Sequence, residues 1–121
     1  MATLEIPRNE WIGFFDSFSN RHRGRLITME ILSPELGDQV EARDLPLEGI
    51  TAELSEEADE FDITVGDDSD NHLSKTIFGP QKVWLKQNDE GADEALEIDE
   101  QMGKVLLLLR AAVSADRVSA S

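Results

Sequence analysis

Cysteine is absent from this chain of 121 residues, so disulfide bonds, thiolate catalysis and zinc sites built on sulfur are all excluded. Long apolar runs are absent too. The longest, residues 105–109, is far shorter than the roughly 20 residues that a membrane-spanning helix needs. The first residues lack the basic segment and following apolar segment that are typical of a signal peptide. We therefore expect a cytoplasmic protein with no membrane contact.

Motifs for catalysis or cofactor binding are equally scarce. The chain has two histidines, His22 and His72, and contains neither a G-x-S-x-G elbow nor a glycine-rich phosphate loop. Ser69, Asp70 and His72 lie together in one turn, but neighbours in sequence cannot adopt the three-point geometry of a catalytic triad. We expect no catalytic residues, no cofactor and a non-enzymatic role.

The same turn is the strongest candidate for a metal site. It combines carboxylate, amide and imidazole groups, as ligand-rich loops do, in Asp67, Asp68, Asp70, Asn71 and His72. The spacing of a calcium loop is not met, because Leu73 stands where the glycine belongs and Gly79 where the glutamate belongs. Turns rich in Asp and Asn also form through side-chain capping alone. We therefore predict no metal site.

Acidic residues dominate the charge, since 26 Asp and Glu against 11 Lys and Arg give a formal net charge of −15. Sixteen of the acids lie in two stretches without Lys or Arg, nine in residues 53–70 and seven in residues 89–100. Such surfaces repel nucleic acids and acidic lipids. The simplest interpretation is a well-solvated surface, with residues 88–93 as an exposed loop. Salt adaptation and a nucleic-acid mimic, which needs both stretches on one face, are the alternatives.

A small basic cluster stands out against this background and, with one tryptophan, forms the candidate interaction surface. It consists of Arg21, His22, Arg23, Arg25 and Trp84. Positive charge at the end of a helix also complements the helix dipole and pairs with the protein's own acids, and we favour that explanation. Trp84 lies between apolar neighbours and close to two lysines. It is either exposed for binding or a core residue under the helix, and we favour the core.

Residues 7–23 carry the clearest structural pattern. Trp11, Phe14, Phe15 and Phe18 recur at helical spacing and share one face of the predicted helix. Gly24 follows as a natural left-handed stop. Four of the seven Trp and Phe rings lie on this one stripe, so the helix is expected to form part of the core.

After Gly24 the spacing of apolar residues becomes alternating, which predicts short strands joined by tight turns. The predicted strands cover residues 27–32, 40–54, 61–65, 73–86, 96–98 and 105–109. Pro46 predicts that the second strand is bent, bulged or at an edge, and Gly79-Pro80 predicts a kink in the fourth. The last strand lacks alternation, so we expect it to be covered on both faces.

These elements predict an α+β fold. An N-terminal amphipathic helix packs on a strongly bent antiparallel meander of five or six strands, which curls into a small β-barrel. The element order is similar to that of Sm-like and SH3-like small barrels, although fold alone does not settle function. We expect one domain over residues 1–112 and a flexible tail over residues 113–121.

Three segments resemble a small uncharacterised bacterial family of stand-alone domains. They are residues 5–11 (EIPRNEW), 39–50 (QVEARDLPLEGI) and 90–98 (EGADEALEI). The resemblance extends over nearly the whole chain except the tail. It implies a bacterial, single-domain, cytoplasmic protein, and it supplies no activity and no site residues.

Four functions follow, in order of preference. The first is a non-catalytic interaction module that binds a protein partner or a second copy through a sheet edge, with residues 105–109 as that edge. The second is an Sm-like RNA-binding oligomer with residues 21–25 facing the pore of a ring. A nucleic-acid mimic is third. An enzyme with His22 or His72 beside an acid in a concave pocket is fourth.

Overall fold

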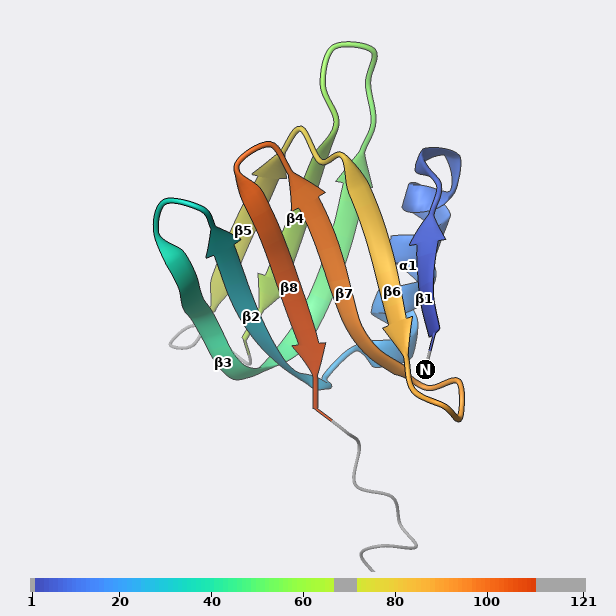
Figure 1. Ribbon diagram of the computed structural model, residues 1–121. Coiled ribbons are helices and arrows are strands. Elements are labelled where there is room, and N and C mark those ends of the chain that lie inside the picture. The colour runs from blue at the N-terminus through green and yellow to red at the C-terminus, as the bar shows by residue number, and fades with distance from the viewer. Residues whose placement is uncertain (1, 67–71, 111–121) are drawn as a thin grey trace, which may run out of the picture.

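The computed structural model describes residues 2–66 and 72–110 (Figure 1). This part of the chain forms an α+β fold of one short helix and eight strands. In chain order the elements are β1 (Ala2–Ile6), the 3-10 turn η1 (Arg8–Glu10), α1 (Trp11–His22), β2 (Leu26–Ser33), β3 (Gly37–Glu53), β4 (Glu60–Val65), β5 (Leu73–Phe78), β6 (Lys82–Gln87), β7 (Asp93–Glu100) and β8 (Gly103–Leu109). The predicted tail, residues 113–121, lies outside the described residues. No described helix is long and apolar enough to cross a membrane.

The strands form one antiparallel sheet in the order β1-β6-β7-β8-β2-β3-β4-β5. Strands β1 and β5 end this order and do not pair with each other, so the sheet is open. The predicted closed barrel of five or six strands is therefore wrong, and the likeness in element order to Sm-like and SH3-like barrels does not hold. One reason is β1, a strand before the helix whose five mostly exposed residues alternate over too short a stretch to identify a strand.

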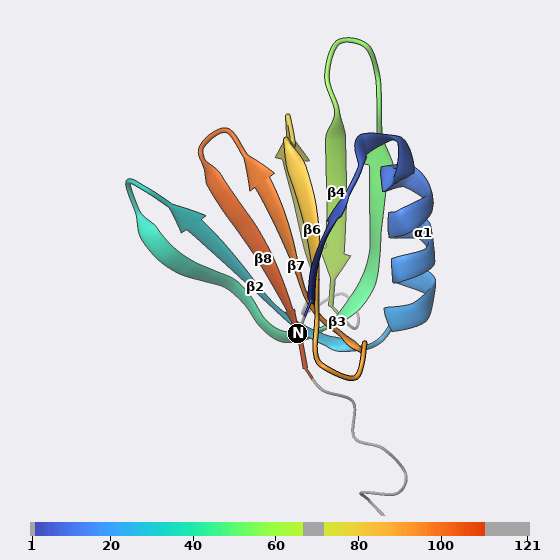
Figure 2. The same ribbon diagram turned by 45° about the vertical axis from the view of Figure 1, so that its right-hand side comes forward.

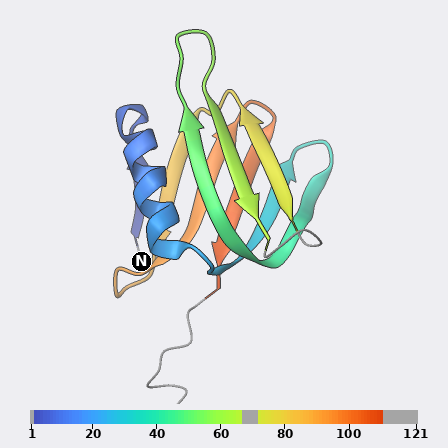
Figure 3. The ribbon, with the colours of Figure 1, turned by 180° about the vertical axis from the view of Figure 1, so that it is seen from behind.

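Strand β3 bends the sheet into two layers, as Pro46 predicted. Its first half pairs with β2 up to Pro46, and its second half pairs with β4 from Leu47 onward. Asp44, just before the bend, has a positive φ of 51°. The front layer contains β1, β6, β7, β8 and β2, and the rear layer contains β4, β5, the second half of β3 and α1 (Figures 2 and 3).

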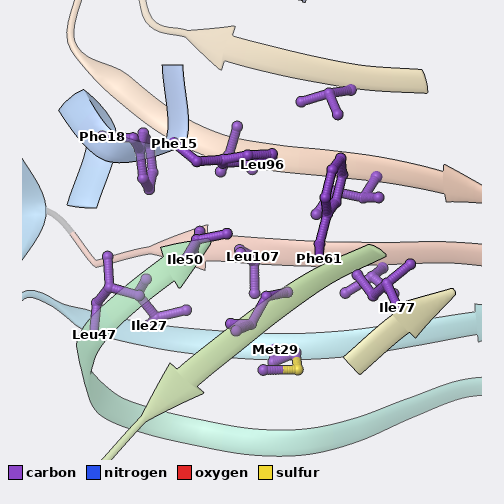
Figure 4. Packing of buried hydrophobic residues seen from close by; sticks show 14 of the residues in the cluster. Phe15, Phe18, Ile27, Met29, Leu47, Ile50, Phe61, Ile77, Leu96 and Leu107 are labelled. Atoms are coloured by element: carbon purple, nitrogen blue, oxygen red, sulfur yellow. The ribbon is translucent and has the colours of Figure 1, made fainter. Parts of the chain in front are cut away.

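The core lies between the two layers and includes the aromatic face of α1, as predicted. Trp11, Phe15 and Phe18 are buried and Phe14 is half-buried. Phe15, Phe18 and Phe61 are among the buried side chains in Figure 4. The Phe61 ring of β4 meets Phe15 and Trp11 edge to face, with centroids 4.7 Å and 5.0 Å apart. Such contacts add to the free energy gained by burying the rings.

A buried serine holds α1 on the second half of β3. The Ser19 hydroxyl donates a hydrogen bond to the Ile50 carbonyl (3.2 Å) and accepts one from the Ile50 amide (2.8 Å). After α1, Gly24 has a φ of 86°, a left-handed conformation that favours glycine and turns the chain toward β2. The predicted stop at Gly24 is thus confirmed.

Two strand predictions are corrected by the topology. Residues 73–86 form two separate strands, because the chain crosses between layers at Gly79-Pro80; β5 pairs with β4, whereas β6 lies between β1 and β7. Strand β8 lies between β7 and β2, so it is an interior strand and cannot be the predicted edge. The core covers only one face of β8, and not both faces as expected. Val105 and Leu107 are fully buried on that face, while Leu106 and Leu108 are half-buried on the outer face.

Candidate functional site

Asp93 binds two residues of the basic cluster where α1 ends and β7 begins. Its Oδ2 accepts hydrogen bonds from Arg21 Nη1 and His22 Nε2, both at 2.8 Å, and its Oδ1 accepts one from Gln87 Nε2 at 3.0 Å. The Asp93 side chain is only 3% exposed. Burial alone would raise the pKa of Asp93, but the hydrogen bonds from Gln87, His22 and Arg21 outweigh it and lower the pKa.

The other basic residues also contact their own chain. Arg25 donates from Nη1 to His22 Nδ1 (3.1 Å) and from Nε to the Arg110 carbonyl (2.8 Å). Because a guanidinium can only donate, this contact makes His22 Nδ1 an acceptor, and Nε2 then carries the hydrogen that reaches Asp93. Arg23 reaches the Glu48 carbonyl at 3.4 Å. Pairing with the protein's own acids, the favoured interpretation, is seen for Arg21 and His22, whereas these contacts of Arg23 and Arg25 are with carbonyl oxygens and the His22 ring.

Trp84 belongs to a different part of the molecule. In β6 its neighbours Val83 and Leu85 are buried in the core, so the Trp84 side chain lies on the outer face of the front layer, half-buried. The Lys82 ammonium lies 5.6 Å from the ring centroid, and the indole nitrogen donates to Asp99 Oδ2 at 3.0 Å. The favoured placement of Trp84 in the core under the helix is therefore wrong.

Charged groups surround Trp84 on this outer face. Glu97 lies opposite Trp84 and contacts Lys86 (3.3 Å) and Lys104 (3.2 Å). Burial and the neighbouring Glu97 carboxylate raise the pKa of Asp99. Burial also acts to raise the pKa of Glu97, but hydrogen bonds with Asp99, Lys104 and Lys86 lower it overall.

Strand residues of the two acidic stretches lie on opposite faces of the molecule. Asp62 alternates with the core residues Phe61 and Ile63, so it lies on the outside of the rear layer. Glu97 alternates with core residues of β7 in the same way, on the outside of the front layer. This arrangement removes the nucleic-acid mimic, which needed one shared face. Asp67, Asp68 and Asp70 lie outside the described residues.

His72 faces a shallow hollow. Its Nε2 lies 2.9 Å from Glu48 Oε2, and both side chains, with Arg23, line a space of about 340 Å³. The two side chains are 45% and 56% exposed, so water reaches the contact freely. Of the turn considered and rejected as a metal site, only His72 is described, and residues 67–71 lie outside the described residues. Elsewhere in the described chain, no group of three or more His, Cys, Asp or Glu side chains could hold a metal ion.

The free sheet edges, β1 and β5, differ in character. Lys75 in β5 lies on the same strand face as the buried Ile77, opposite Ile63 of β4. An inward-pointing charge on an edge strand opposes the addition of another strand. In β1 the corresponding positions are apolar, and Leu4 is 45% exposed. Of the two edges, β1 is therefore the one open to pairing.

Comparisons with known proteins place the chain in a family but assign no function to it. A family of unknown function (DUF5335) matches residues 2–118. The chain belongs to this family. An uncharacterised protein of Aquifex aeolicus (strain VF5) is 27% identical over 113 residues, which cover 93% of this chain and 96% of the relative. No solved structure matches. The resemblance to an uncharacterised bacterial domain family is thus confirmed, and DUF5335 membership transfers no catalytic or binding residue.

Two features of this DUF5335 chain escaped the sequence analysis. Asp93 was expected in an exposed loop over residues 88–93, yet it is buried at the start of β7. No local signal marks Asp93, because it is one of the seven acids in residues 89–100. Strand β1 was not predicted either, because five mostly exposed residues before Pro7 carry too short an alternation to identify a strand.

Proposed function

We propose that this domain is a non-catalytic interaction module that binds an extended segment of another protein molecule by strand addition at the free edge of β1. The proposal rests on the difference between the two edges. In β5 the inward-pointing Lys75 opposes the addition of a strand, whereas β1 has only apolar side chains toward the core. Backbone hydrogen bonds supply affinity in this mode of binding, and alternate side chains supply specificity.

The surroundings of β1 favour an added strand. Leu4 lies opposite Leu85, a core residue of β6, yet Leu4 itself is 45% exposed. A strand added beside β1 would cover the Leu4 side chain and remove apolar surface from water. On the other face of β1, Thr3 and Glu5 would stay in contact with solvent, as on an ordinary half-buried strand.

An enzyme acting on a small substrate is the second candidate, favoured by one observation. The hollow beside His72 places an imidazole, the Glu48 carboxylate and the Arg23 guanidinium together, which is the arrangement that this hypothesis requires. We rank it lower because the His72 and Glu48 side chains are both about half exposed. Water at such a site screens the charge interactions that catalysis would use. Retained activity in a His72→Ala variant would remove it.

The RNA-binding oligomer is the weakest of the remaining proposals. It needs the segment from Arg21 to Arg25 to face RNA, whereas Arg21 and His22 are bound to Asp93 and Arg25 to the Arg110 carbonyl. The net charge of −15 further opposes a phosphate backbone.

Strand addition at β1 can be tested by placing a photo-crosslinking amino acid at matched positions on the two edges. Thr3 in β1 and Ser74 in β5 are both exposed side chains of edge strands. In the native host we expect a discrete crosslinked product from position 3, and we expect Leu4→Lys to abolish it while Phe78→Lys leaves it intact. Products from position 74 alone, or insensitivity to Leu4→Lys, would contradict the proposal.

A further inference from the structure

The edge of β1 is self-complementary, and we infer that the segment it binds is β1 of a second copy of this chain, in an antiparallel pair centred on Leu4. The inference rests on the proposed function and names the partner. A two-fold axis perpendicular to the front layer relates the copies, so the two front layers join into one continuous sheet.

The register follows from the side chains of Ala2–Ile6. Centring on Leu4 pairs Leu4 with Leu4 of the second copy, Thr3 with its Glu5, and Ala2 with its Ile6. All five residues of the strand are then used, and apolar residues meet only apolar residues on the core side. Centring on Glu5 would set two carboxylates opposite each other, which is unfavourable.

Charge also favours this register. Thr3 lies opposite Lys86 in the existing sheet. In the dimer, Glu5 of the second copy lies opposite Thr3 on the side away from Lys86. The Lys86 ammonium then lies between two carboxylates. One is Glu97, which it already contacts, and the other is Glu5 of the second copy. Local attraction therefore opposes the overall repulsion between two chains of net charge −15.

Helix α1 adds area that a five-residue strand alone lacks. It lies behind β1 and β6, so the two-fold axis brings the helices of both copies to the same side of the joined sheet (Figures 1 and 2). Ser19 holds one side of α1 on β3, while Gly13, Phe14 and Ser17 on another side line a hollow of about 380 Å³. A Cβ at Gly13 would meet nothing within 4 Å, so space remains for a second helix.

Single-cysteine crosslinking tests the inference, because the chain has no cysteine of its own. Residues directly opposite in an antiparallel pair have Cα separations suited to a disulfide. We expect Leu4→Cys to form a covalent dimer at least roughly tenfold faster than Phe78→Cys on the other edge, which is 71% exposed. Thr3→Cys mixed with Glu5→Cys should crosslink, and each alone should not.

Sedimentation equilibrium of the full chain at moderate salt gives the second readout. We expect a concentration-dependent dimer that Leu4→Lys weakens by at least roughly tenfold, because the pair would then bury an uncompensated charge. Leu36→Lys is the matched control, since Leu36 is 69% exposed in the turn between β2 and β3. It should leave the dimer unchanged.

Two results overturn the inference. One is a wild-type chain that stays monomeric up to about 1 mM. The other is a Leu4→Cys crosslinking rate equal to that of Phe78→Cys. If a crosslinked product from position 3 in the host nevertheless contains a different protein and disappears in Leu4→Lys, strand addition at β1 stands and only the second copy is wrong. If that product is also absent, the proposed function fails as well.

Discussion

The Asp93 carboxylate accepts a hydrogen bond from His22 Nε2 at 2.8 Å and thereby joins the last residue of α1 to the first residue of β7. Arg21 and Gln87 bind the same carboxylate. Since Ser19 bonds α1 to β3 in the rear layer, Asp93 supplies the matching attachment to the front layer. The helix is therefore held to both layers by polar contacts as well as by its rings.

Replacing Asp93 with Asn should strongly destabilise the fold. The buried carboxylate is the acceptor for Arg21, His22 and Gln87, and an amide of the same size leaves these donors without a charged partner. Breaking a buried charged contact costs about 3 kcal/mol in the free energy of unfolding. Urea titration measures the loss. The exposed neighbour Glu94→Gln is the control and should change that free energy by less than about 0.5 kcal/mol.

The pH dependence of stability should carry the signature of Asp93. Its pKa is lowered in the folded protein, so its contribution is present above the pKa of the unfolded chain and is lost as pH falls through the folded pKa. The gap in unfolding free energy between wild type and Asp93→Asn should therefore narrow on acidification. A gap that stays constant from neutral pH to about pH 2 would show that Asp93 does not act through its charge.

The aromatic cluster should dominate the stability of the core. Phe61 is fully buried and contacts the rings of Trp11 and Phe15 across the two elements. Phe61→Ala should lower the free energy of unfolding by about 3–5 kcal/mol, because it removes a large buried side chain and leaves a cavity. Phe78→Ala removes the same side chain at a site that is 71% exposed. Thermal unfolding should show almost no change in that control.

Two glycines should respond to Ala in opposite directions. Gly103 has a φ of 148°, and a Cβ there would lie 2.0 Å from the Leu32 carbonyl oxygen, so Gly103→Ala should cost more than about 1 kcal/mol. Gly13 is inside α1, where a Cβ meets nothing, so Gly13→Ala should stabilise the dilute protein by about 0.5–1 kcal/mol. Equal effects at the two sites, measured by urea titration, would contradict this account.

The sequence predicted best those elements whose apolar residues recur at a regular spacing. The aromatic residues of α1 recur at helical spacing, and the burial of Trp11, Phe15 and Phe18 confirms the predicted core face. The bend at Pro46 was also predictable, because proline lacks the N–H that a continuous ladder needs.

Long-range arrangement could not be predicted from the same signals. Gly79-Pro80 fits a kink within one strand as well as a crossover between layers, and only the partners of β5 and β6 decide between them. Asp93 is one of seven acids in its stretch, and nothing local separates it from its exposed neighbours. Asp93 binds residues at the end of α1, and the tertiary structure, not the local sequence, decides which strand that end of the helix meets.

Strand β1 has a partner that comes very late in the chain, since Ile6 pairs with Val83 and Ala2 with Gln87. During synthesis the backbone groups of β1 cannot form hydrogen bonds with β6 until most of the chain has left the ribosome. Loop closure over so many residues is slow relative to local hairpin formation. Nascent chains therefore carry β1 without its partner strand for much of translation.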